Sequence, residues 1–218
     1  MNYAVILAGG TGSRAGGSLP KQFQIVKGKR LFWWSVQAFR EFDEDCRIIL
    51  VVHRDYLKDW DRLFGKEERE FGYPITKREG GSSRFYSVRN ALSLIDDPSS
   101  VVFIHDGARP LVTPALINRG ACIVRKGRGA VPAVPLVDSI RKLTPEGSVS
   151  VPRSDYVAVQ TPQIFYVEDI KGAYESAKDD NGFTDDASVA EFFGIGIGVF
   201  PGDTDNIKIT NPEDFKRL

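Results

Sequence analysis

An α/β fold with a mostly parallel sheet is predicted by the first third of the chain. Residues 3–8 and 47–52 are apolar without alternation, which is typical of parallel strands buried on both faces. Segments with apolar residues at helical spacing follow both strands. The first strand also runs directly into a glycine-rich loop at 8–14. Because ligands of open α/β sheets bind beyond the carboxyl ends of the strands, we expect the functional site at this loop.

The alternation of strands and helices continues to residue 135. The predicted strands are 3–8, 47–52, 101–105 and 129–135. The predicted helices are 30–42, 56–71, 85–95 and 114–124. In the first helix Phe32, Val36 and Phe39 share one stripe, and Trp33 and Trp34 widen that face, so we interpret both tryptophans as core residues.

Between Asp138 and Gln160 this alternation breaks. Residues 139–143 and 148–152 look like two strands around a turn at 144–147, where proline at the second position and glycine at the fourth suit a type I turn. A two-stranded hairpin is marginal on its own. We therefore expect an inserted β-hairpin arm at about 138–160 that packs on a partner subunit rather than lying as a flap on the surface.

After the arm the helical patterns resume. We expect helices over 167–177 and 185–193, strands over 195–200 and 207–210, and a short C-terminal helix that begins after Asn211. Asp185 and Asp186 fall in the first turn of their helix, where the helix dipole favours them. No internal repeat or linker is evident, so we expect one domain over 1–218.

Charge and cysteine content exclude several classes of function. Lys plus Arg and Asp plus Glu both total 29 in 218 residues, so no overall basic field draws the chain to nucleic acid or to an anionic membrane. Cys46 and Cys122 lack ligand or disulfide spacing, and we interpret both as buried thiols of a reducing compartment. No apolar run is long enough to span a bilayer. We expect a cytoplasmic protein.

The glycine-rich loop has the chemistry of a triphosphate site. Gly10 and Gly12 let backbone N–H groups approach anionic oxygens, and Arg14 and Lys21 supply positive charge. Residues 10–15 also match the dinucleotide pattern G-x-G-x-x-A, but Pro20 and two glycines prevent the helix that this pattern needs. An NAD-binding oxidoreductase is therefore disfavoured, and a loop that wraps a triphosphate explains the two cations.

Carboxylates and one lysine complete the candidate set. Asp106 follows strand 101–105, at the edge where a carboxylate can hold Mg²⁺ together with phosphate oxygens, and Asp205 is the second candidate metal ligand. Lys208 stands between two isoleucines in a predicted strand, so it points either into the site or to solvent. No Ser-His-Asp or Cys-His pairing is indicated, and we interpret His53 and His105 as structural.

Eight segments carry a resemblance to a known family. They are residues 8–14 (AGGTGSR), 20–23 (PKQF), 80–81 (GG), 87–88 (SV), 105–110 (HDGARP), 160–163 (QTPQ), 184–188 (TDDAS) and 206–210 (NIKIT). In this order along the chain they resemble the 2-C-methyl-D-erythritol 4-phosphate cytidylyltransferases of the non-mevalonate isoprenoid pathway. The resemblance implies a Rossmann-like three-layer sandwich, use of CTP and a sugar-alcohol phosphate, release of pyrophosphate, and an interlocked homodimer.

The resemblance also implies a role for each matching residue. It places CTP on Ala8, Gly9, Gly10, Gly12, Gly81, Ser82 and Ser87. It places the methylerythritol phosphate on Asp106, Arg109, Ser139, Arg153, Thr161 and Lys208. It assigns the catalytic contacts to Arg14, Lys21, Arg153 and Lys208. Arg153 and Ser139 lie on the arm, which in the family reaches into the neighbouring subunit.

Two alternatives remain at this point. Ribitol 5-phosphate cytidylyltransferases have much the same first loop, so the sugar phosphate is less certain than CTP. A non-catalytic nucleotide-binding module would be expected to lose the cations or the carboxylate, yet Arg14, Lys21, Asp106 and Lys208 are all present. The chain also departs from the family pattern at Ala15, Ser82 and Ser139, which leaves the detail of the nucleobase pocket open.

Overall fold

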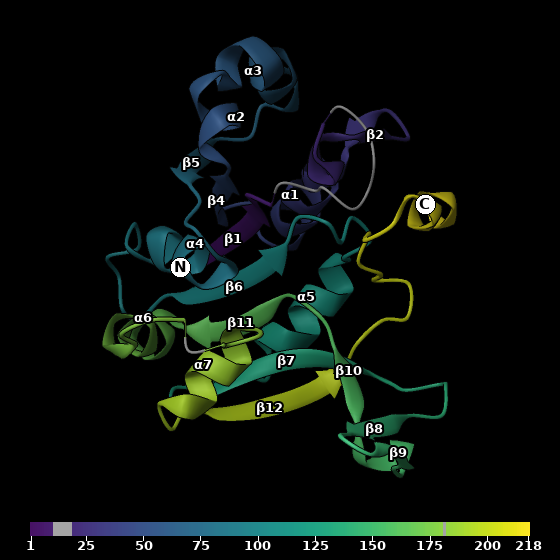
Figure 1. Ribbon diagram of the computed structural model, residues 1–218. Coiled ribbons are helices and arrows are strands. Elements are labelled where there is room, and N and C mark those ends of the chain that lie inside the picture. Colours follow the sequence, from purple (N-terminus) through teal and green to yellow (C-terminus); the bar gives the residue numbers. More distant parts are fainter. Residues whose placement is uncertain (11–18, 181) are drawn as a thin grey trace.

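The computed structural model describes residues 1–10, 19–180 and 182–218, so Gly12, Arg14 and Ala15 lie outside the described residues. Its centre is a sheet of eight described strands with helices on both faces (Figure 1). The strands of this sheet are β1 (Asn2–Ala8), β4 (Arg47–Val52), β5 (Ile75–Glu79), β6 (Val101–Asp106), β7 (Arg128–Pro135), β10 (Val157–Val159), β11 (Gln163–Tyr166) and β12 (Gly196–Pro201). Their order is β10-β7-β11-β6-β1-β4-β5, and β12 also pairs with β7.

Helices flank this sheet, and short elements complete the described chain. The helices are α1 (Leu31–Phe42), α2 (Arg54–Lys58), α3 (Trp60–Phe71), α4 (Arg84–Leu92), α5 (Pro114–Ala121), α6 (Val167–Ser176) and α7 (Asp186–Phe192). The single-turn and 3-10 elements are η1 (Lys21–Phe23), η2 (Arg153–Asp155) and η3 (Pro212–Arg217). Two short hairpins lie outside the main sheet, formed by β2 (Ile25–Val26) with β3 (Lys29–Arg30) and by β8 (Arg141–Thr144) with β9 (Gly147–Ser150).

Strand β1 shows why three layers form. Its alternate residues Ala4 and Ile6 are buried against α1, α3 and α5, whereas Tyr3 and Val5 are buried against α4, α6 and α7. A strand that is apolar on both faces can satisfy both only between two helical layers. The predicted Rossmann-like sandwich with a mostly parallel sheet is thereby confirmed, and Trp33, which stacks on Phe71, is a core residue as expected. Trp34, also expected in the core, is only half-buried, and its Nε1 donates to Val26 O.

Some predicted elements were wrong, and some observed strands were not predicted. The helix predicted over 56–71 is divided at Asp59 into α2 and α3. Residues 207–210 form no strand. The edge strand β5 and the antiparallel strands β10 and β11 were not predicted. Cys46 is buried as expected, but Cys122 is exposed. No helix in the described part of the chain is long and apolar enough to cross a membrane.

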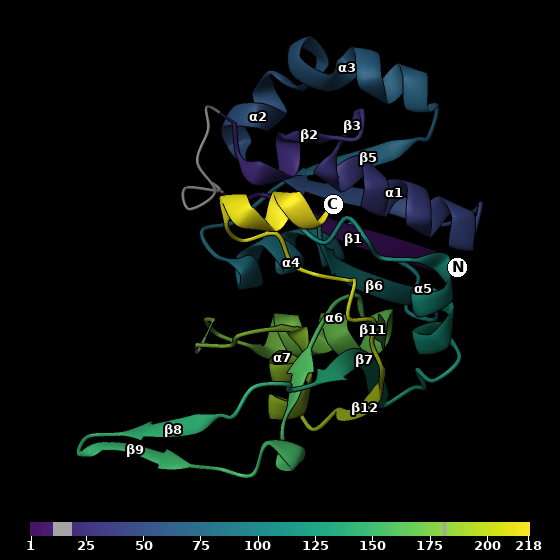
Figure 2. The same cartoon turned by 90° about the vertical axis from the view of Figure 1, so that its right-hand side faces the viewer.

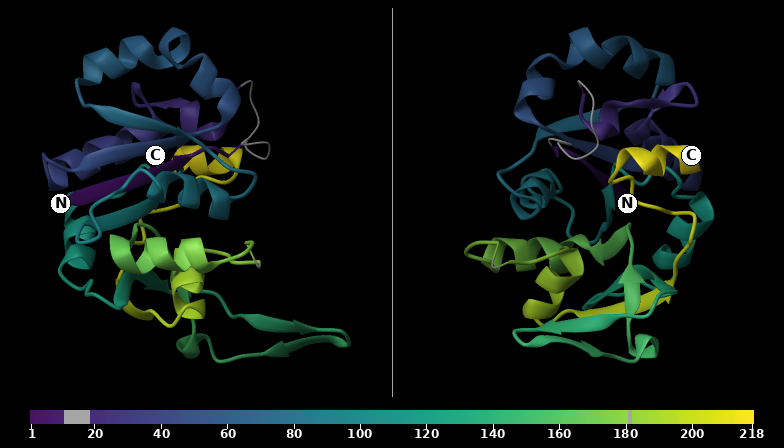
Figure 3. Two further views of the ribbon diagram at one scale, coloured as in Figure 1. Left: turned by 90° about the vertical axis from the view of Figure 1, so that its left-hand side faces the viewer. Right: turned by 45° about the vertical axis from the view of Figure 1, so that its right-hand side comes forward.

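The hairpin β8–β9 extends away from the sheet (Figure 2). Its strands pair from Arg141 opposite Ser150 to Thr144 opposite Gly147, one or two residues from the predicted bounds. The C-terminal segment, yellow in Figure 3, takes a different course, because Ile209 N donates to Ala108 O just beyond β6. One end of the chain is therefore brought to the carboxyl end of the central strands, while the arm leaves the body.

Candidate active site

Asp106 ends β6, and three cations surround its carboxylate. Lys208 Nζ lies 2.8 Å from Oδ2, Arg109 Nε lies 3.8 Å from Oδ2, and Arg84 Nε lies 3.8 Å from Oδ1. We call these four residues the Asp106 cluster. Burial alone would raise the pKa of Asp106, but the charges of Arg84, Lys208 and Arg109 hold this pKa well below its usual range. The carboxylate is therefore ionised and can accept hydrogen bonds from a hydroxyl group.

A hydrogen-bonded chain behind the cluster fixes Asp106 and Arg109. Asp106 N donates to Thr161 Oγ1 over 3.1 Å, and Thr161 Oγ1 lies 3.0 Å from His105 Nδ1. His105 Nε2 lies 3.1 Å from Arg109 O, a pure acceptor, which assigns the proton to Nε2 and makes Nδ1 the acceptor from Thr161. Burial lowers the pKa of His105 to about 4 and keeps the ring neutral, as this tautomer requires. His105 is thus structural, as predicted.

Hydrogen bonds from side chains to main-chain carbonyls hold the C-terminal segment and bring Lys208 to the site. Arg109 Nη1 donates to Asn206 O over 2.7 Å, and Asn206 Nδ2 donates to Thr161 O over 2.9 Å. These bonds join residues 45 to 97 positions apart in the chain. Lys208 therefore points into the site, although the strand expected around it is absent. Thr161, Asp106, Arg109 and Lys208, four of the predicted sugar-phosphate residues, lie together.

A second carboxylate lies behind Arg84. The two terminal nitrogens of Arg84 donate to the two oxygens of Asp186 over 2.8 and 2.6 Å, and Tyr174 Oη donates to Asp186 Oδ1 over 2.7 Å. Asp186 is fully buried. Burial alone would lower the pKa of Arg84, but Asp186 holds it above its ordinary value, so Arg84 stays charged. The sequence favoured Asp186 at a helix N-terminus but did not reveal this pairing, which joins residues 102 positions apart.

The predicted CTP residues that are described lie on two loops. Ala8, Gly9 and Gly10 follow β1, and Gln22 Nε2 donates to Ala8 O and Gly10 O over 2.8 and 2.6 Å. Gln22 thereby ties the segment that carries Lys21 to the start of the first loop. On the second loop, Ser82 is exposed.

Gly81 and Ser87 shape the second loop. Ser87 Oγ accepts from Gly81 N over 3.0 Å and donates to Ser83 O over 2.9 Å. A Cβ on Gly81 would lie 2.3 Å from Tyr86 Cβ and 2.8 Å from the Tyr86 carbonyl carbon, so only glycine fits. The hydroxyl of Ser87 therefore holds the loop in shape, a role that the sequence did not indicate.

The remaining predicted site residues are not brought to the cluster. Ser139 and Arg153 are exposed on the arm, and Arg153 Nη1 donates to Val137 O within the same arm. Asp205 is exposed, and its backbone N–H donates to Asp203 Oδ1 over 3.0 Å. Gly12 and Arg14 lie outside the described residues.

The two candidate metal ligands do not form a metal cage. Among the described residues no group of three or more His, Cys, Asp or Glu side chains could hold a metal ion. The Asp106 carboxylate is already surrounded by three cations, which repel a further positive ion. The residues present therefore do not fit a metal held by the protein alone, and no catalytic step below depends on one.

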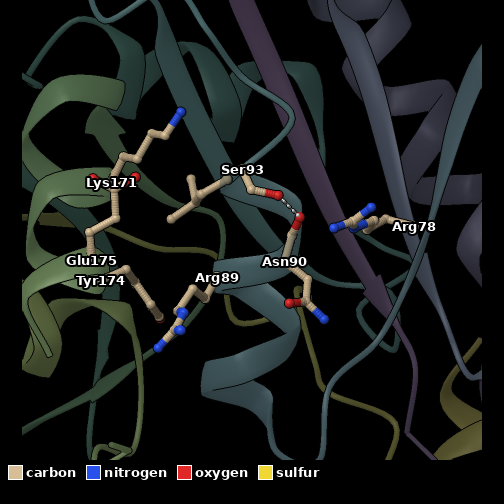
Figure 4. A pocket seen from close by; sticks show the side chains of 8 residues that line it. Arg78, Arg89, Asn90, Ser93, Lys171, Tyr174 and Glu175 are labelled. Atoms are coloured by element: carbon tan, nitrogen blue, oxygen red, sulfur yellow. Dashed lines mark hydrogen bonds between the residues drawn. The ribbon is translucent and has the colours of Figure 1, made fainter. Parts of the chain in front are cut away.

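A pocket of about 320 Å³ lies between α4 and α6 (Figure 4). Arg78, Arg89 and Lys171 contribute its cations, and Glu175 contributes one carboxylate. Lys171 Nζ donates to Ile95 O over 2.8 Å, and Ser93 Oγ donates to Asn90 O. Neither Asp106 nor Lys208 lines this pocket, so it is separate from the Asp106 cluster.

Comparisons with known proteins agree with this geometry. The family model of 2-C-methyl-D-erythritol 4-phosphate cytidylyltransferase (IspD) matches residues 2–217. The curated enzyme of that name from Bacteroides thetaiotaomicron is 42% identical over 212 residues, which cover 97% of this chain and 95% of the relative. The corresponding enzyme from Bacteroides fragilis is 43% identical over 215 residues, which cover 98% and 95%.

Solved structures similar to this chain come from enzymes of the same kind. The crystal structure of the cytidylyltransferase from Thermus thermophilus is 27% identical with a TM-score of 0.74, covering 97% of this chain and 94% of that one. The 4-diphosphocytidyl-2C-methyl-D-erythritol synthase of Anaerococcus prevotii is 25% identical with a TM-score of 0.80, covering 99% and 92%. Enzymes of this kind generally use a divalent metal. From its fold, its site and these relatives, the chain belongs to the 2-C-methyl-D-erythritol 4-phosphate cytidylyltransferase family of nucleotidyltransferases.

Proposed function

We propose that the chain transfers CMP from CTP to 2-C-methyl-D-erythritol 4-phosphate in isoprenoid biosynthesis, and that it does so in the cytoplasm. A phosphate oxygen of the sugar phosphate attacks the α-phosphorus of CTP, a new P–O bond forms, and the bond to the β-phosphate oxygen breaks to release pyrophosphate. The substrate phosphate is its own nucleophile, so the protein needs neither a nucleophile nor a base. Its work is to position two anions and neutralise the charge at the α-phosphorus.

The observation that carries the proposal is the Asp106 cluster. An ionised carboxylate suits the hydroxyls of a sugar alcohol, and the Lys208 ammonium beside it, with 43% of its side chain exposed, suits a phosphate. We assign Asp106, Arg109, Thr161 and Lys208 to the sugar phosphate. We assign the CTP half to Ala8, Gly9, Gly10, Gly12, Arg14, Lys21, Gly81, Ser82 and Ser87. For the metal we propose Mg²⁺ carried by the triphosphate, because Mg²⁺ prefers phosphate oxygens and retained waters to protein cages.

We further propose a homodimer formed through the arm. Val137, just before the arm, and Leu143, on β8, are 81% and 82% exposed, so both present apolar surface that a partner could cover. A second copy would cover them and would bring Ser139 and Arg153 to the neighbouring Asp106 cluster. The two strands of the arm pair with each other in a separate two-stranded sheet, which is marginal on its own and so supports this assignment.

The test is pyrophosphate release from CTP, measured with methylerythritol phosphate, with ribitol 5-phosphate and with neither. We expect release with methylerythritol phosphate and none without a sugar phosphate. A preference for ribitol 5-phosphate would change the substrate and leave the chemistry intact. Absence of release with both would reject the transferase assignment and leave a nucleotide-binding module, which direct CTP binding would detect.

A further inference from the structure

Arg84 and its buried partner Asp186 lie next to Asp106 but are not among the assigned substrate contacts. Arg84 begins α4, one turn after the Gly81 loop, and lies between two carboxylates, Asp186 and Asp106. Its terminal nitrogens bond Asp186 at 2.6 and 2.8 Å, whereas its Nε stays 3.8 Å from Asp106 Oδ1. The longer distance exceeds a hydrogen bond. Arg84 therefore forms its hydrogen bonds with Asp186 and only faces Asp106.

The pairing of Arg84 with Asp186 matters because a guanidinium competes strongly with a substrate hydroxyl for a carboxylate. Arginine presents five donors in a fork that fits both oxygens of one carboxylate. If Asp186 did not hold that fork, the nearest anion in reach of Arg84 would be Asp106. A bidentate Arg84–Asp106 pair would use the oxygens that a substrate hydroxyl needs. It would also weaken the ion pair between Lys208 and Asp106 Oδ2.

We propose that Asp186 is a positioning residue of the sugar-phosphate site, which diverts Arg84 from Asp106 and so leaves the Asp106 carboxylate open to the substrate hydroxyls. Tyr174 supports this arrangement by donating to Asp186 Oδ1, and the full burial of Asp186 keeps water from competing with Arg84 for its carboxylate. The inference rests on the proposed binding of a sugar-alcohol phosphate at Asp106. It predicts an effect on that substrate alone, because the Asp186 contacts do not include the CTP residues.

The experiment compares Asp186→Asn with a matched control. Asp186→Asn keeps the shape of the side chain and removes its charge. Glu68→Gln is the control, because Glu68 likewise receives a cation, Lys77, and an aromatic N–H, from Trp60, but lies away from the site. We expect Asp186→Asn to raise the KM for methylerythritol phosphate by about tenfold or more, the usual worth of a hydrogen bond to a charged group. The KM for CTP should change less than about twofold, and Glu68→Gln should change neither KM.

A second variant keeps the proposal testable if Asp186→Asn does not fold. Arg84→Lys keeps a cation opposite Asp186 but has one nitrogen, which cannot grip both oxygens and also face Asp106. It should give the same selective rise in KM, with thermal melting confirming a folded protein. An unchanged KM for the sugar phosphate in a folded variant, or an equal rise for CTP, would overturn the inference. Inactivity of the wild-type protein towards methylerythritol phosphate would instead reject the proposed function.

Discussion

The side chains of the Asp106 cluster are paired within the chain, whereas those of the hairpin arm are largely exposed. Asp106 in the cluster and Asp186 behind it are buried, and each carboxylate faces a cation from a distant part of the chain. On the arm and just before it, Leu143 and Val137 are more than four-fifths exposed, and Arg153 donates to the nearby Val137 carbonyl. The cluster is complete within one chain, whereas the arm has the composition of a surface that another chain covers.

This difference teaches how the work of the site is divided. Asp106, Lys208 and Arg109 are positioned by β6 and by the C-terminal segment, so their geometry is available before any ligand or partner arrives. Ser139 and Arg153 have no such support. Their proposed contribution to the site therefore requires the proposed dimer, and variants in the two regions should behave differently.

The largest effect is expected inside the cluster. Lys208→Met removes the cation 2.8 Å from Asp106 and should lower kcat/KM for methylerythritol phosphate by roughly 100- to 1000-fold, as does the loss of one preorganised donor in other enzymes. The control is Lys126→Met, because Lys126 forms a surface ion pair with Glu168. Steady-state kinetics of both proteins decide the matter. Equal rates in the two variants would remove Lys208 from the site.

The arm should show its effect through assembly. Leu143→Asp is expected to convert a dimer into monomers and to abolish most activity, whereas Val199→Asp, at another exposed apolar residue on β12, should leave assembly unchanged. Sedimentation or light scattering measures the change. A wild-type monomer with full activity would contradict the proposed role of the arm.

Subunit mixing sharpens the same comparison. Arg153→Ala and Lys208→Met should each be nearly inactive alone. If Arg153 acts on the neighbouring cluster, a mixed dimer has one site with both lesions and one intact site, so an equal mixture should regain about a quarter of wild-type activity. Reassociation followed by the pyrophosphate assay measures this. No recovery from confirmed mixed dimers would show that both residues act on the same chain's site.

A smaller effect is expected where the body is tightly packed beside the cluster. Gly81→Ala places a Cβ 2.3 Å from Tyr86 Cβ, so the loop before α4 must move, and we expect the KM for CTP to rise by about tenfold. Gly172→Ala is the control, because no atom lies within 4 Å of the added carbon on α6. Similar kinetics for both variants would show that the loop does not shape the CTP site.

The last effect concerns stability towards acid rather than catalysis. The pKa of His105 falls from about 6.5 in the unfolded chain to about 4 in the folded one, so between these values only the unfolded chain takes up the proton. Acidification through this window should therefore cost roughly 3 kcal/mol of unfolding free energy. Urea titrations at pH 7 and 4.5 measure the loss, and His105→Gln should reduce it. The same slope in both proteins would show that other groups cause it.

The parts of the fold that were predictable are those with strong local patterns. Strands β1, β4, β6 and β7 are mostly apolar, and α1 and α5 carry clear stripes or a proline start, so their positions were predicted to within a few residues. The sequence Ile75–Glu79 is mostly polar because β5 is an edge strand, and β10 and β11 span only three and four residues. Such segments pair only because neighbouring strands offer them partners.

The sequence by itself determined the chemistry of this protein, since its glycine loop, its segments 105–110 and 206–210 and their order along the chain indicate a cytidylyltransferase. Only the tertiary structure decided which groups meet. Lys208 reaches Asp106 although its predicted strand is absent, and Asp186 pairs with Arg84 across 102 positions. The physical reason is that ion pairs of this kind depend on burial and on the course of the whole chain, neither of which leaves a periodic signal in the residues that take part.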